Sequence, residues 1–165
     1  DGLDFRGIRA SINPDIQITV NSTTLSRSGQ WFRVSWSGVP DPKYTDWVAL
    51  YLAPGGDISG GVPLKLKYAS ADPAHMETGA GSLSFTVTSY RQDVAFVLVR
   101  GGPGAMQVAA QGPVIRVANP NAPLQGHLAL TGKPGEVSVQ WNSWNASQPT
   151  VKWGVTPGVY TRSAP

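Results

Sequence analysis

The chain has 165 residues, with 13 Lys and Arg against 10 Asp and Glu, and a net charge of +3. Charged residues make up only 14% of the total, hydrophobic residues make up 41%, and there is no cysteine. Disulfides, thiolate metal sites and a cysteine nucleophile are therefore excluded. The basic residues are scattered, whereas nucleic-acid binding uses a basic stripe or cluster, so we expect no nucleic-acid partner.

The pattern of glycine, proline and apolar residues indicates the fold class. The 19 Gly and 14 Pro are spread along the chain, and no long segment has apolar residues at helical spacing. Short alternating segments between turn signals are instead typical of β-strands. No segment is apolar over the length of a membrane-spanning helix, so no membrane span is expected. The sequence predicts an all-β protein.

The stretch from Gln30 to Leu52 (QWFRVSWSGVPDPKYTDWVALYL) has the clearest strand pattern and three of the six tryptophans. Phe32, Val34 and Trp36 alternate with polar residues, as in a strand with one buried face. The apolar run after the Pro-rich turn predicts a central strand. We expect Phe32, Val34 and Trp36 to be buried against the apolar segment Val94–Val99.

About seven strands are expected between residues 15 and 118, which is the count of an immunoglobulin-like β-sandwich. Residues 1–14 show no clear period and are expected to form an extended lead-in. Asp41 and Asp46 flank the Pro-rich turn and are interpreted as turn formers. The Gly-rich loop 53–63 lacks the Gly-Lys-Ser/Thr sequence of a phosphate-binding loop, so it is interpreted as a surface loop.

A second unit is expected over residues 126–165, after a Pro-rich linker at residues 119–125. Its strands are expected near residues 126–130, 137–141 and 151–155, with a fourth beginning at Tyr160. This is only part of a sandwich that normally takes about 100 residues. Because an incomplete sandwich leaves a sheet edge and an apolar face open, we expect another domain or subunit to cover this unit.

Two N-glycosylation sequons occur, at Asn21 (Asn-Ser-Thr) and at Asn145 (Asn-Ala-Ser), both in polar, turn-like surroundings. Sequons in such surroundings favour a secreted protein. The chain begins at Asp1, which is compatible with a removed leader. We therefore expect N-glycans on Asn21 and Asn145 and an extracellular or cell-wall location.

A series of segments has a recognisable order and spacing. They are SGQW at 28–31, VSWSGV at 34–39, DWV at 46–48, GAGSLSF at 79–85, ANP at 118–120, HLAL at 127–130, VSVQW at 137–141 and VKWG at 151–154. Together they resemble the N-terminal region of the large plant-type purple acid phosphatases. The resemblance covers residue 16 to about residue 160. It implies an immunoglobulin-like sandwich followed by the opening of a fibronectin type III-like domain.

The resemblance implies a parent protein that is an acid phosphatase with a C-terminal catalytic domain. That domain hydrolyses phosphate esters at a two-metal site, which holds iron with zinc, manganese or a second iron. Its ligands come from GDxG, GDxxY, GNH[ED], VxxH and GHxH motifs, and none of these occurs in this chain. Gly56-Asp57-Ile58-Ser59 lacks the Gly and the Tyr that the first two motifs require.

The two histidines, His75 and His127, have no partner at ligand spacing. They are interpreted as a surface-loop residue and a strand residue. No G-x-S-x-G nucleophile elbow is present either. We therefore expect no catalytic residue, no metal and no cofactor in this chain.

Three functions stay open. The first is the non-catalytic N-terminal module of a secreted purple-acid-phosphatase-like metallophosphoesterase, whose catalytic domain, or a neighbouring subunit, covers the second unit. The second is a structural glycoprotein of an extracellular surface or filament, assembled from sandwich modules by strand addition. The third is a carbohydrate-binding module, which requires the rings of Trp31, Trp144 and Trp153 to face solvent.

Overall fold

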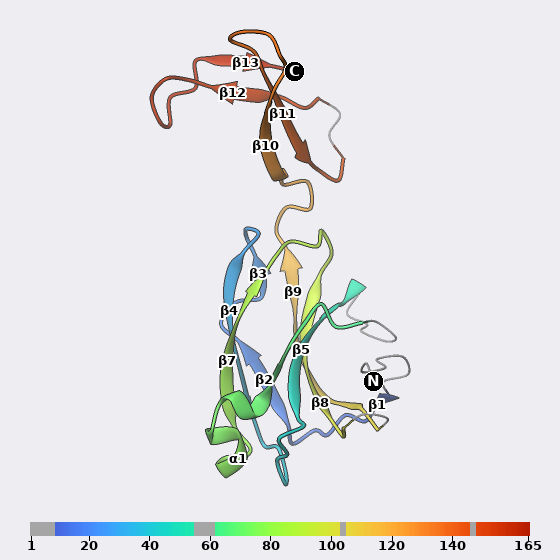
Figure 1. The fold of residues 1–165 in the computed structure, drawn as a ribbon. Helices are drawn as coiled ribbons and strands as arrows, with labels where there is room; N and C mark the ends of the chain where they lie inside the picture. Colours follow the sequence, from blue (N-terminus) through green and yellow to red (C-terminus); the bar gives the residue numbers. More distant parts are fainter. Residues whose placement is uncertain (1–8, 55–61, 103–104, 146–147) are drawn as a thin grey trace. The chain divides into compact units, whose positions relative to one another are not determined.

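The computed structural model describes residues 9–54, 62–102, 105–145 and 148–165 (Figure 1). The chain divides into two units, residues 1–118 and 119–165. Strands make up nearly all of the regular structure in both units, which confirms the all-β prediction. No helix in the described ranges is both long enough and apolar enough to cross a lipid bilayer.

The first unit is a sandwich of two β-sheets. The larger sheet has the strand order β1-β9-β8-β5-β6, with β3 also paired to β9, and the smaller sheet has the order β2-β4-β7. In chain order the strands are β1 (Arg9–Ala10), β2 (Gln17–Val20), β3 (Thr24–Leu25), β4 (Gln30–Ser37), β5 (Trp47–Leu52), β6 (Lys65–Tyr68), β7 (Gly81–Val87), β8 (Val94–Arg100) and β9 (Gln107–Val117). β4 and β5 lie in different sheets, so the stretch between Gln30 and Leu52 supplies both halves of the core.

Two short strands lie where the sequence analysis expected none. β1 falls within the expected lead-in, and β3 falls within the mainly polar segment 21–29. Both pair in parallel with β9, which is more than eighty residues further along the chain. Neither segment has enough residues to show an apolar period, so only the pairing with β9 identifies it as a strand.

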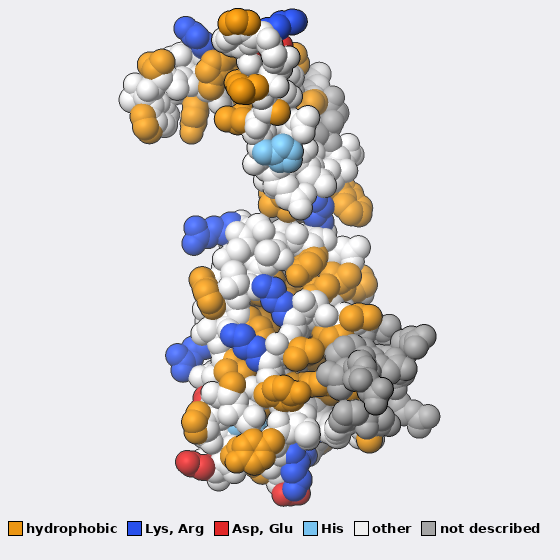
Figure 2. Space-filling view, in the orientation of Figure 1, with side chains coloured by type: hydrophobic (Ala, Val, Ile, Leu, Met, Phe, Trp, Pro, Cys, Tyr) orange, Lys and Arg blue, Asp and Glu red, His pale blue; other side chains and the backbone are white. Residues whose placement is uncertain are grey.

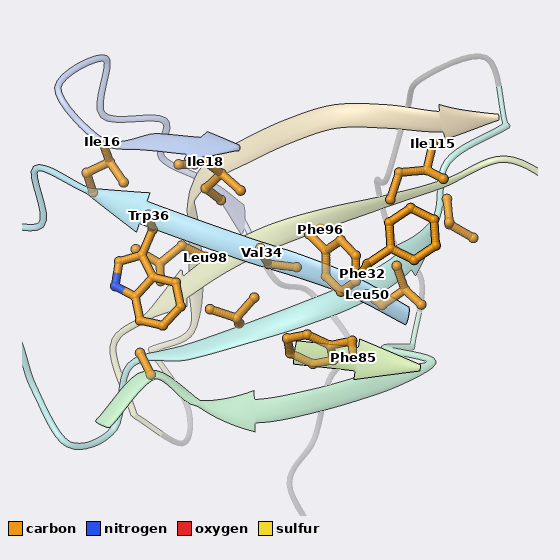
Figure 3. Close-up of a cluster of buried hydrophobic side chains, with 14 of the residues drawn as sticks. Ile16, Ile18, Phe32, Val34, Trp36, Leu50, Phe85, Phe96, Leu98 and Ile115 are labelled. Carbon is orange, nitrogen blue, oxygen red and sulfur yellow. The ribbon is translucent and has the colours of Figure 1, made fainter. Parts of the chain in front are cut away.

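The core between the two sheets has the composition that the sequence predicted. Phe32, Val34 and Trp36 of β4 are 0%, 1% and 3% exposed and belong to one buried cluster with Phe96 and Leu98 of β8 (Figure 3). This confirms the expected burial of the β4 face against the apolar segment 94–99. An aromatic contact between Phe85 and Phe96, with ring centroids 4.9 Å apart, joins the two sheets in the same cluster.

β5 and β8 are buried on both faces, as the continuous apolar run predicted for a central strand. The outer face of the larger sheet carries a second buried cluster, formed by Trp47, Ala49, Tyr51, Val97, Val99, Met106 and Val108. Burial raises the pKa of the Tyr51 hydroxyl. That hydroxyl has no hydrogen-bond partner among the described residues.

Two short helices lie between β6 and β7, where no helix was expected: η2 (Ala69–Ala71) and α1 (Ala74–Thr78). Oδ1 of Asp72 accepts the N–H of Ala74 at 3.1 Å at the start of α1. Gly79 ends α1 in the left-handed conformation, with φ at +69°. Asp-Pro before a helix and Gly after it are start and stop signals. Five residues, however, are too few to show a helical apolar period.

The second unit contains two separate two-stranded sheets. One pairs β10 (Leu124–Leu130) with β11 (Val137–Asn142), and the other pairs β12 (Val151–Trp153) with β13 (Arg162–Ala164). β10 starts within the expected linker because Leu124 pairs with Asn142 before the register shifts. The last strand begins at Arg162 and not at Tyr160. No described residue of this unit is buried.

Candidate functional site

The first unit holds a buried polar network around Asp46 and His75, whose side chains are both fully buried. The Nε1–H of Trp36 donates a hydrogen bond to Nδ1 of His75 at 3.1 Å. Because an indole N–H can only donate, Nδ1 is the unprotonated ring nitrogen. The neutral ring then carries its proton on Nε2, which lies 3.3 Å from Oδ2 of Asp46.

Asp46 has further partners that offset the burial of its carboxylate. Oδ2 accepts the N–H of Lys43 at 2.9 Å, and Oδ1 lies 3.4 Å from Nε of Arg100. Arg100 also donates from Nη2 to the carbonyl oxygen of Asp41 at 2.8 Å. A buried charge is tolerated when it is paired and hydrogen-bonded. The network therefore ties β5 and β8 of the larger sheet to β4 of the smaller one through His75.

The interpretation of His75 as a surface-loop residue is wrong. α1 turns its side chain inward, where it meets an indole from β4 and a carboxylate that precedes β5. The capping residues around α1 were the available signal, but they do not show which side of the helix faces the core. Asp46 does accept a turn hydrogen bond from Lys43, as expected of a turn former, and its complete burial adds a second role.

The Asp46–His75 pair does not form an active site. In a catalytic pair, the histidine nitrogen opposite the carboxylate faces a nucleophile or a substrate. Here that nitrogen faces the indole N–H of Trp36, and the ring has no exposed surface. The arrangement therefore stabilises the sandwich and offers no group to a ligand.

The other candidate residues do not come together in one site. His127 is an exposed strand residue on β10, as expected, with Nε2 lying 3.2 Å from Oε1 of Gln140. Asp41 is exposed, and a hydrogen bond from Lys43 together with its positive charge lowers the pKa of the carboxyl group. The segment 56–59 lies outside the described residues. Within the described ranges, no three His, Asp or Glu side chains are grouped so as to hold a metal ion.

The two sequons lie on the surface, one in each unit. Asn21 is exposed at the end of β2, and its Oδ1 accepts the N–H of Arg33 at 3.0 Å. Asn145 is exposed, and its N–H donates to Oδ1 of Asn121 at 2.8 Å. The remaining sequon residues at 146–147 lie outside the described ranges. Both asparagines have the exposure that a glycan requires, and their glycosylation stays a prediction.

The second unit exposes large apolar side chains on both of its hairpins and in the segments between their strands. Leu128 and Leu130 of β10 lie opposite Val139 and Val137 of β11, so these four side chains share one face of the hairpin. Leu130 is 87% exposed and Val155 is 100% exposed. We call the full set the second-unit apolar surface, and Figure 2 shows hydrophobic side chains across this unit. It comprises Leu128, Leu130, Val137, Val139, Trp144, Trp153, Val155, Val159 and Tyr160.

An open groove of about 360 Å³ crosses the same unit. Its apolar lining comes from Pro123, Val139, Trp141, Pro149 and Val151, and the remaining lining residues are glycine or uncharged polar residues. No described lining residue carries a charge. The groove and the second-unit apolar surface therefore suit a partly apolar protein surface better than a charged small molecule.

The first unit matches a known family. The family described as "Fn3-like domain from Purple Acid Phosphatase" matches residues 16–119. The chain belongs to this family. The match falls on the first sandwich, where an immunoglobulin-like sandwich was expected, whereas the fibronectin type III-like domain was expected over residues 126–165.

Similar proteins extend the match over both units. "Probable inactive purple acid phosphatase 1" from Arabidopsis thaliana is 29% identical over 178 residues, covering 95% of this chain and 29% of that protein. "Probable inactive purple acid phosphatase 27" from the same plant is 28% identical over 183 residues, covering 99% of this chain and 30% of that protein.

A solved structure of a purple acid phosphatase from yellow lupin (Lupinus luteus) seeds superposes with a TM-score of 0.74 at 25% identity. It covers 93% of this chain and 30% of the lupin chain. These similarities confirm the resemblance noted in the sequence. The chain corresponds to the N-terminal region of its relatives and spans about 30% of their length.

Proposed function

We propose that this chain is the non-catalytic N-terminal module of a secreted purple-acid-phosphatase-like protein, and that its second unit docks onto the catalytic domain of that protein. The second-unit apolar surface carries the proposal. It lies uncovered on a chain that spans about 30% of its relatives, which leaves them ample sequence for a domain that covers it. Two of the relatives are named inactive, so the docking role does not require phosphate ester hydrolysis.

The energetics support docking over an independent second domain. Isolated two-stranded hairpins are at best marginally stable in water, and this unit consists of two of them. Burying one Leu or Val side chain contributes about 1.5–3 kcal/mol. Covering the face formed by Leu128, Leu130, Val137 and Val139 therefore supplies several kcal/mol toward both association and folding of the unit.

Amide hydrogen exchange tests the proposal. The 165-residue chain is measured alone and in the presence of the catalytic domain of a related purple acid phosphatase that lacks its own matching N-terminal region. Amides of β10 to β13 should become protected, while amides of the first-unit core should not change. Leu130→Asp should weaken binding at least tenfold, and Thr131→Asp, which adds the same charge outside the second-unit apolar surface, should have little effect. Unchanged exchange throughout the second unit would overturn the proposal.

Self-assembly is a second candidate, supported by the same surface. Both hairpins of the second unit have unpaired edges in the described ranges, and a neighbouring copy that adds a strand or a face would complete them. Size-exclusion chromatography over a hundredfold concentration range tests this. A concentration-dependent shift to larger species supports it, and a monomer at every concentration contradicts it.

Carbohydrate binding is a third candidate, supported by exposed tryptophans. Trp31 and Trp144 are 64% and 66% exposed, and Trp153 is partly exposed. The first of these lies in the first unit and the other two lie in the second. A change in tryptophan fluorescence on titration with cell-wall glycans is expected if this function holds. An unchanged spectrum contradicts it.

A further inference from the structure

We infer that Trp31 is the packing surface for the N-glycan of Asn21, with the first sugar of that glycan lying against the exposed indole ring. The inference rests on the glycosylation of a secreted chain, which belongs to the proposed function, and it is independent of docking by the second unit. It assigns a role to Trp31, which belongs neither to the buried core nor to the second-unit apolar surface.

Trp31 is unlike the other first-unit tryptophans. Trp36 and Trp47 are buried, whereas Trp31 is 64% exposed at the start of β4, the central strand of the smaller sheet. Successive residues of a strand alternate between faces, so Trp31 and Arg33 share the solvent face. A single exposed aromatic residue is common and by itself assigns nothing. The surroundings of Trp31 are what point to a ligand.

Asn21 is held in one orientation next to this face. Its N–H donates to the carbonyl oxygen of Arg33 at 3.2 Å, and its Oδ1 accepts the N–H of Arg33 at 3.0 Å. Because a backbone N–H can only donate, the atom that faces Arg33 is Oδ1 and not Nδ2. Nδ2, which would carry the glycan, is therefore not the atom bound to Arg33, and no described residue forms a hydrogen bond to it.

The side chain of Arg33, which shares the solvent face of β4 with Trp31, is drawn away from that ring. Nη2 of Arg33 donates to Oγ of Ser82 at 2.8 Å, which draws the guanidinium toward β7. Ser82 pairs with Ser35, whereas Trp31 pairs with Thr86 at the other end of β7, so the guanidinium also leans away from Trp31.

β2 does not extend alongside Trp31. It pairs with β4 only as far as Val20 opposite Val34, and the chain then leaves to form β3 on the other sheet. Among the described residues, Trp31 thus has a strand neighbour on the β7 side only. Asn21, opposite Arg33, is a diagonal neighbour of Trp31 across the sheet, and such neighbours lie roughly 7–8 Å apart. One sugar ring attached to Nδ2 spans that distance.

The chemistry of the two groups is complementary. One face of an N-acetylglucosamine ring consists of C–H groups, and an indole ring offers a flat apolar surface with a large contact area. Packing the two together removes apolar surface of both from water. The glycan would also restrain the end of β2, because Asn21 is already joined to β4 by two hydrogen bonds.

A double-mutant cycle on the secreted chain tests the inference. The four proteins carry Trp31 or Trp31→Ala, each with Thr23 or Thr23→Ala. Thr23→Ala removes the sequon but keeps Asn21 and its bonds to Arg33. With Trp31 present, the glycan should raise Tm by about 2–4 °C, a shift typical of one modest interaction in a chain of this size. With Trp31→Ala it should raise Tm by less than about 1 °C.

Three controls sharpen the cycle. Trimming the glycan to its first sugar with an endoglycosidase should retain the gain in Tm, and Trp31→Phe should restore part of it. Removal of the second sequon by Asn145→Gln should change Tm equally with and without Trp31. An equal glycan effect in both Trp31 backgrounds would overturn the inference. An Asn21 without glycan in the mass spectrum would overturn it as well, whereas the hydrogen-exchange test of docking would be unaffected.

Discussion

The two units are built from the same kind of strand and differ in what covers it. In the first unit, the apolar face of β4 packs against β8 of the opposite sheet, and Phe32 and Phe96 have no exposed surface. In the second unit, the shared apolar face of β10 and β11 stays exposed, with Leu130 87% exposed. Burial contributes roughly 25 cal/mol for each Å² of apolar surface removed from water. The first unit thus buries its own apolar strand faces, whereas the described apolar face of the second unit is exposed, and we propose that a partner covers it.

The largest expected effect is at Trp36. Trp36→Ala removes core packing and the hydrogen bond to His75, so the free energy of unfolding of the first unit should fall by about 3–5 kcal/mol. Trp153→Ala, which truncates a partly exposed ring in the second unit, should change this free energy of unfolding by less than about 0.5 kcal/mol. Urea denaturation measures both. A loss below about 1 kcal/mol for Trp36→Ala would mean that the buried face of β4 is assigned wrongly.

The buried carboxylate of Asp46 is next. Asp46→Asn keeps the size of the side chain but removes the charge that faces His75 and Arg100, and hydrogen bonds to charged groups contribute about 1.5–3 kcal/mol. The free energy of unfolding should fall by that amount. Asp41→Asn is the control, because the Asp41 side chain is exposed, and it should have little effect. Equal stability of the two variants would show that the buried network does not stabilise the sandwich.

Gly81→Ala tests how closely the start of β7 packs against Trp36 of the neighbouring strand β4. A Cβ at Gly81 would lie 2.6 Å from a ring carbon of buried Trp36, so the indole would have to shift. Such overpacking costs about 1–3 kcal/mol. The same change at Gly126 in the second unit meets no atom within 4 Å and should not destabilise the chain. Calorimetry of both variants compares the units directly, and a destabilising Gly126→Ala with a neutral Gly81→Ala would reverse the comparison.

The smallest expected effect is a pH dependence at Asp72. Hydrogen bonds from the backbone N–H groups of Ser82 and Ala74 lower the pKa of its carboxyl group below the usual 3.8. A carboxyl group with a lower pKa in the folded state stabilises that state above its unfolded pKa, and this contribution is lost as the pH falls through the folded pKa. Asp72→Asn should therefore flatten the acid side of the stability profile. Glu136→Gln, in the second unit, is the control, and an equal flattening by both would contradict the assignment.

Much of the first unit could be predicted from local patterns. The alternation of Phe32, Val34 and Trp36 identified both the strand and its buried face, because side-chain direction in a strand follows the residue number. The continuous apolar run at β5 identified a central strand, because a strand covered on both faces has apolar residues at nearly every position. The short strands β1 and β3 could not be found, because they become strands only through pairing with distant β9.

The features of the candidate sites also divide into those that local sequence shows and those that depend on distant contacts. The sequons at Asn21 and Asn145 and the absence of the family's metal-binding motifs from this chain were readable from the printed sequence, because each depends on residue type and spacing alone. The family resemblance was readable too, since it depends on the order of short segments.

The folded chain alone decided the surroundings of particular side chains. His75 is buried because an indole from β4 and a carboxylate before β5 meet it there, and no local pattern records a contact between three distant segments. Alternation along β4 already placed Trp31 and Trp36 on opposite faces, but the contact of Trp36 with His75 was decided by the fold. Whether the apolar face of a strand becomes part of a core depends on the sheet opposite it, and among the described residues only strand faces of the first unit are buried in this way.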